Sequence, residues 1–108
     1  MKYTIYLLRQ DDRGPDAQAT VVMNVECNSA PSRIIDFVGG DGLMSDGYSG
    51  KEYPFSVESD PESRGVILAY HANESRPLLI QSDDLIAPGQ RLWIEGDECS
   101  YTITRISW

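Results

Sequence analysis

The sequence predicts a mainly β (α+β) fold: an antiparallel sheet or partly open barrel of roughly five to seven strands, with one short helix near residues 30–38. Three observations support this. Apolar and polar residues alternate along several segments, which is the pattern of half-buried strands. Glycine, proline and aspartate separate those segments at short intervals. The 108 residues are a usual length for one domain, and no linker or repeat divides them, so we treat residues 1–108 as a single domain.

Two strands are expected first, at residues 2–9 and 19–27, with a polar turn over residues 10–17 between them. The strand at 2–9 is apolar on both faces, which indicates a central or well-covered position in the sheet. Further strands are expected at residues 53–58, 66–72 and 78–81. Pro54 suggests an edge or a bulge within the first of these, because proline lacks the N–H that a central strand needs.

The one expected helix covers residues 30–38. Ser29 is suited to cap its N-terminus, and Ile34 and Val38 lie four residues apart, so they would share one apolar face. Gly39 is a typical C-terminal stop. A helix this short is stable only when it packs on a sheet.

Residues 39–50 are expected to form a glycine-rich loop. The loop lacks the phosphate-binding patterns GxxxxGK[ST] and GxGxxG, and its carboxylates Asp41 and Asp46 would repel phosphate. Their spacing also differs from that of a calcium-binding loop. Two interpretations stay open for Leu43, Met44 and Tyr48: they cover the open end of the sheet, or they contact a partner protein.

The final hairpin is the clearest element, because Gly96-Asp97 fits a two-residue type II′ turn. This turn sets the register of the strands on either side of it. The expected pairs are Ile94 with Cys99, Leu92 with Tyr101, Trp93 with Ser100 and Arg91 with Thr102. The apolar pairs fall on one face, so the turn and the hydrophobic pattern agree.

The alternation also predicts which side chains form the core. We expect burial of twelve residues: Ile5, Leu7, Val21, Met23, Val25, Ile34, Phe37, Val57, Leu68, Leu92, Ile94 and Ile103.

The charge balance restricts the class of partner. The net charge is −8, and the nine basic residues are scattered, with no two adjacent. Nucleic-acid binders need clustered Lys and Arg to displace counterions from phosphates, so we expect no binding to nucleic acid or to an anionic membrane. An acidic surface instead favours a protein partner with a basic surface.

No motif for catalysis or metal binding is present. The single histidine, His71, lies far in sequence from the two cysteines, Cys27 and Cys99, and no CxxC pair or GxSxG elbow occurs. We therefore expect no enzyme activity, cofactor or metal, and free thiols that act as small hydrophobic residues. The chain has no signal-peptide pattern and no apolar run long enough to span a bilayer, which predicts a cytoplasmic protein.

These features lead to two hypotheses for function. The first is a small acidic protein-binding module that inhibits another protein, as an immunity protein or a phage-encoded anti-defence protein does. The second is a structural assembly protein. The residues expected to contact the partner are the acids and large apolar groups of the predicted turns: Asp41, Leu43, Met44, Asp46, Tyr48, Asp83, Asp84, Trp93, Glu95, Asp97 and Glu98.

The C-terminal segment carries the only resemblance to a known family. Residues 87–96, APGQRLWIEG, followed by Tyr101-Thr102-Ile103, resemble the closing hairpin of small bacteriophage head–tail joining barrels. That family also has a proline-glycine turn, a strand, a glycine turn and a tyrosine-bearing strand, but no helix such as the one expected at residues 30–38. The resemblance covers a short part of the chain and implies the assembly hypothesis.

Overall fold

The computed structural model describes residues 1–28, 37–60, 65–70, 75–80, 86–94 and 99–107. None of these residues is helical. They form eight strands: β1 (Lys2–Asp11), β2 (Gly14–Cys27), β3 (Phe37–Asp46), β4 (Lys51–Asp60), β5 (Gly65–Tyr70), β6 (Ser75–Ile80), β7 (Arg91–Ile94) and β8 (Ser100–Ser107).

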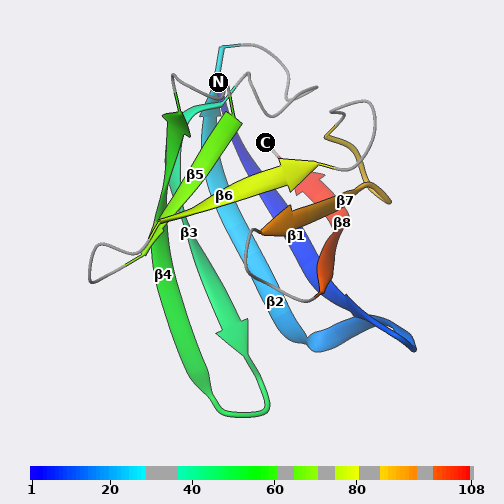
Figure 1. The fold of residues 1–108 in the computed structure, drawn as a ribbon. Coiled ribbons are helices and arrows are strands. Elements are labelled where there is room, and N and C mark those ends of the chain that lie inside the picture. Colours follow the sequence, from blue (N-terminus) through cyan, green and yellow to red (C-terminus); the bar gives the residue numbers. More distant parts are fainter. Residues whose placement is uncertain (29–36, 61–64, 71–74, 81–85, 95–98, 108) are drawn as a thin grey trace.

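All neighbouring strands are antiparallel, and they pair in the order of the sequence. The sheet closes because β8 also pairs with β1, with Thr4 opposite Ser107 and Arg9 opposite Tyr101. Figure 1 shows the four long strands β1–β4 on one side and the short strands β6 and β7 crossing in front of them. The predicted antiparallel β fold is confirmed, but the sheet has eight strands and forms a closed barrel.

The core fills the barrel as the alternation predicts. Along β1, Tyr3, Ile5 and Leu7 point inward and are buried, while Tyr6 and Leu8 point outward and are half-buried. Of the expected core residues, Ile34 lies outside the described residues. All the others are buried. The interior also takes in six residues that were not in the expected set: Tyr3, Cys27, Phe55, Val66, Ile86 and Tyr101.

The prediction of a helix is wrong for those of its residues that the structure describes. Phe37 and Val38, its last two residues, begin β3, and residues 30–36 lie outside the described part of the chain. Phe37 pairs with Cys27 of β2 and is only 2% exposed. Aromatic residues fit a strand that is buried on one face, so packing against β2 outweighs the helical spacing of the apolar residues.

The predicted glycine-rich loop is also mostly strand, which is why the sheet has more strands than expected. Residues 39–46 belong to β3, and only residues 47–50 form a turn. A Cβ on Gly40 would lie 2.0 Å from the backbone oxygen of Asn24, and one on Gly42 would lie 2.3 Å from Cζ of Phe55. Glycine is thus required there by close packing of β3 on its neighbours, and not by a flexible loop.

The final hairpin has the predicted register. Leu92 pairs with Tyr101, Trp93 with Ser100 and Arg91 with Thr102. Leu92, Ile94 and Tyr101 are buried, as the face assignment requires. The turn at Gly96-Asp97 lies outside the described residues.

Candidate functional site

The two expected acidic contacts that the structure describes, Asp41 and Asp46, do not share one surface. Asp41 and Asp46 both lie on β3, five residues apart, which is about 16 Å along an extended strand. An odd separation also places them on opposite faces of the sheet. The remaining five acids of the prediction lie outside the described residues, namely Asp83, Asp84, Glu95, Asp97 and Glu98.

The four expected apolar contacts differ in exposure. Met44 packs against the core, so for this residue the structure favours the core-covering interpretation. Leu43 and Trp93 are half-buried on β3 and β7. Tyr48 is 71% exposed and lies in the turn between β3 and β4. Of the four, Tyr48 alone offers most of its surface to a partner.

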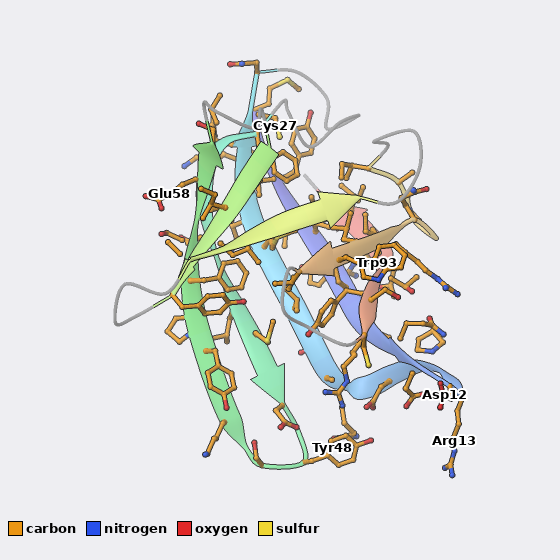
Figure 2. The ribbon with its side chains drawn as sticks, viewed as in Figure 1. Asp12, Arg13, Cys27, Tyr48, Glu58 and Trp93 are labelled. Atoms are coloured by element: carbon orange, nitrogen blue, oxygen red, sulfur yellow. The ribbon has the colours of Figure 1, made fainter. Side chains whose placement is uncertain are left out.

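Tyr48 lies at the end of the barrel where the β1–β2 and β3–β4 turns meet, which we call the hairpin end. We define it by Arg9, Asp16, Asp46, Tyr48 and Tyr53. Figure 2 shows Tyr48 at the same end of the molecule as Asp12 and Arg13, whereas Glu58 lies toward the opposite end.

Asp16 links the two hairpins. Its Oδ1 accepts hydrogen bonds from the Gln18 amide at 2.9 Å and from the Tyr48 hydroxyl at 3.2 Å, and its Oδ2 accepts one from Arg9 Nη2 at 3.3 Å. Asp16 is only 9% exposed, and buried charges need such partners. The Gln18 amide, the Arg9 guanidinium and the Tyr48 hydroxyl together hold the pKa of Asp16 below its ordinary value.

The same contacts affect the groups around Asp16. Burial opposes ionisation of Arg9, but the hydrogen bond and the charge of Asp16 outweigh it and raise the pKa of Arg9. The hydrogen bond and the charge of Asp16 likewise raise the pKa of Tyr48. Arg9 and Asp16 are therefore both ionised at neutral pH, and the Tyr48 hydroxyl keeps its proton.

Asp46 orders the turn that carries Tyr48. Its Oδ1 accepts a hydrogen bond from the Tyr48 amide at 3.0 Å, and its Oδ2 accepts one from the Ser49 hydroxyl at 3.0 Å. These two donors lower the pKa of Asp46. The backbone oxygen of Asp46 also accepts a hydrogen bond from the Gly50 amide at 2.8 Å. The turn is thus fixed at its backbone, and Tyr48 is fixed at its hydroxyl.

Aromatic side chains and charges of both signs meet at the hairpin end, where Arg13 and Lys51 are exposed as well as the acids. Tyr53 of β4 is 43% exposed and lies opposite Met44 of β3. Asp11 and Asp12 are exposed in the neighbouring β1–β2 hairpin. Exposed aromatic rings surrounded by charges suit recognition of another protein more than chemistry on a small substrate.

Arg9, Asp16 and Tyr53 were not among the residues predicted to contact a partner. The first two follow from a longer hairpin than was expected: β1 and β2 continue past Leu8 after a shift in register, which brings Arg9 opposite Asp16. Extending the alternation of β1 beyond residue 9 would have indicated this pair. Nothing in the local sequence indicates that Tyr48 reaches Asp16, 32 residues away.

The described residues contain no group of three His, Cys, Asp or Glu side chains that could hold a metal ion, and no helix among them is long and apolar enough to cross a membrane. His71 lies outside the described residues.

Comparison of the chain with known protein families, with curated proteins and with solved structures finds no match.

Proposed function

We propose that this chain is a protein-binding module that contacts a basic surface of another protein through the hairpin end. The observation that carries the proposal is the state of Tyr48: the side chain is 71% exposed, yet its hydroxyl is bonded to Asp16 and its backbone amide to Asp46. An aromatic ring held in place before binding loses little freedom when a partner covers it. Large aromatic residues are also frequent among the few side chains that dominate binding energy.

The charge of the chain supports a basic partner. A net charge of −8 attracts a basic protein over several ångströms and speeds its association, an effect that salt weakens. Asp11 and Asp12 are exposed at the hairpin end itself. A module that covers the basic functional surface of its partner blocks that surface, so we propose inhibition as the biological role, of the immunity or anti-defence type.

One observation favours the second hypothesis, structural assembly. Tyr6, Val22 and Leu43 are cross-strand neighbours on β1, β2 and β3, and all three point outward and are half-buried. An apolar row on the outer face of a barrel suits a broad apolar contact with another subunit. Such a contact would depend little on charge, which separates it from the proposed inhibitor.

The test begins with capture of a partner from cells of the source, and then uses that purified partner in binding kinetics at low and moderate salt. Tyr48→Ala should speed dissociation, because it removes the aromatic anchor. Asp12→Lys should slow association several-fold and weaken its salt dependence. Asp12 makes a better variant than Asp46, whose carboxylate also orders the turn.

Glu58→Lys is the matched control, because it makes the same charge change on an exposed residue toward the other end of the barrel. If Glu58→Lys slows association as much as Asp12→Lys, or if association does not depend on salt, the hairpin end is not the contact surface. Inhibition is tested separately by adding the chain to the partner in equal amounts. Loss of the partner's activity supports an inhibitor, whereas larger complexes with unchanged activity support assembly.

A further inference from the structure

A groove of about 540 Å³ crosses the outer face of β1, β2 and β3, near the end of the barrel opposite the hairpin end. Its volume falls within the range of small-molecule sites, about 300–1,000 Å³. Gly40 contributes no side chain to it, and the close approach of its backbone to Asn24 prevents any larger residue at this position. Glycine at this position is therefore a consequence of how closely β3 packs on β2.

Three polar side chains form a row across the groove, joined by two hydrogen bonds that run in the same direction. The Thr4 hydroxyl donates to Oδ1 of Asn24 at 2.9 Å, and Nδ2 of Asn24 donates to Oδ1 of Asp41 at 3.2 Å. After these bonds, the second oxygen of Asp41 can still accept a hydrogen bond, and the second N–H of Asn24 can still donate one. Acceptors and donors therefore alternate along the row.

Glu26 adds a carboxylate to the wall of the groove. Its Oε1 accepts a hydrogen bond from the N-terminal ammonium at 3.0 Å. Its Oε2 is shielded from solvent, so a ligand in the groove does not contact this oxygen directly.

The formal charges around the groove cancel. Glu26 and Asp41 are balanced by the Lys2 ammonium, which also lines the groove, and by the N-terminal ammonium on Glu26. Such a site gives no net preference for an anion or a cation. Neighbouring hydroxyl groups each donate and accept hydrogen bonds, so a neutral polyhydroxylated ligand matches the alternating row.

We propose that this groove is a binding site for a neutral carbohydrate of one or two sugar units. The site is separate from the hairpin end, so its test does not depend on the protein partner.

The experiment follows backbone amide chemical shifts of the ¹⁵N-labelled chain during separate titrations with maltose, lactose and N,N′-diacetylchitobiose. Saturable shifts should be confined to the amides of Thr4, Asn24, Glu26, Gly40 and Asp41. Asp41→Ala should weaken binding by about tenfold, equivalent to about 1.4 kcal/mol. Glu52→Ala, an acid-to-alanine change on an exposed residue of β4 near the other end of the barrel, should leave binding unchanged, and the dispersion of each spectrum shows whether the variant is folded.

Sorbitol and N-acetyl-arginine amide are titrated as an acyclic polyol and a cation. If none of the three sugars gives saturable shifts at the groove, if sorbitol gives the same shifts as the sugars, or if the cation alone binds, the proposal is overturned. The same holds if Glu52→Ala weakens sugar binding as much as Asp41→Ala.

Discussion

The two halves of the barrel are built differently. Strands β1–β4 contain between 10 and 14 residues each, whereas β5–β7 contain between 4 and 6 and β8 contains 8. Both halves nevertheless contribute equally buried side chains to the core. At most 1% of the surface is exposed for Ile5 and Met23 in the long half and for Leu68 and Leu92 in the short half. The long half has extensive backbone pairing, and the short half is held by its side chains in the core.

The candidate functional features follow the same division. The hairpin end lies on β1–β4, and so does most of the polar groove, which Ser107 of β8 also lines. The long strands extend far enough to carry exposed turns and a broad outer face. We infer that the short half closes and stabilises the barrel, while the long half presents surfaces for recognition.

The largest effect is expected from removing a core side chain in the short half. Ile94→Ala in β7 should lower the free energy of unfolding by about 2–5 kcal/mol, as Ile5→Ala should in β1, because both side chains fill the same core. Equilibrium unfolding in urea measures both values. A cost below about 1 kcal/mol for Ile94→Ala, with a full cost for Ile5→Ala, would mean that β7 is not an integral part of the barrel.

A smaller effect is expected from close packing within the long half. Gly39 and Gly40 have similar φ angles, 157° and 153°, but an added Cβ would lie 3.6 Å from the nearest atom at Gly39 and 2.0 Å at Gly40. Gly40→Ala should therefore cost about 1–3 kcal/mol more than Gly39→Ala in urea unfolding. Equal costs would show that β2 and β3 can separate at this point without penalty.

The link between the two long hairpins should be visible in the pH dependence of stability. The folded-state pKa of Asp16 lies below its ordinary value of 3.8, so its stabilising contribution is complete above that value and disappears as the pH falls through the folded-state pKa. Asp16→Asn should therefore destabilise the chain at pH 7, and the difference from the wild type should shrink in strong acid.

Asp12→Asn, which changes an exposed carboxylate in the adjacent turn, is the control for general charge effects. Thermal unfolding from pH 7 to below pH 3 provides the measurement. A difference between wild type and Asp16→Asn that stays constant over this range would exclude the ionised Asp16 as the link.

The smallest effect is expected at the seam where the two halves meet. The guanidinium carbon of Arg105 on β8 lies 4.1 Å from the ring centre of Tyr6 on β1. Arg105→Ala should cost about 0.5–1 kcal/mol, the value of an exposed cation–π contact, and Arg105→Lys should cost less. If Arg105→Ala is neutral in urea unfolding, this contact does not contribute to closure.

The sequence was sufficient for features that depend on local alternation. The burial of Ile5, Leu7 and Met23 and the register of Leu92 with Tyr101 follow from a period of two residues and from one turn. The two hypotheses for function and the residues expected to contact a partner stay predictions.

Features that depend on distant neighbours could not be predicted in this way. Glycines in β3 resemble those of a loop, and only the approach of Asn24 and Phe55 shows why Gly40 and Gly42 occur in a strand. The network of Arg9, Asp16 and Tyr48 joins two hairpins and has no local signal. The error at residues 37–46 and the unrecognised site therefore share one cause, which is contact between segments far apart in the chain.

The pairing of β1 with β8 has a consequence for the order of folding. Thr4 lies opposite Ser107, so the ring is completed by residues at opposite ends of the sequence. During synthesis from the N-terminus, β1–β4 can pair as successive hairpins, but the free edge of β1 has to wait for the last strand. Contacts this distant in sequence slow folding. The exposed edge of β1 is thus the segment most open to misassociation while the chain is being made.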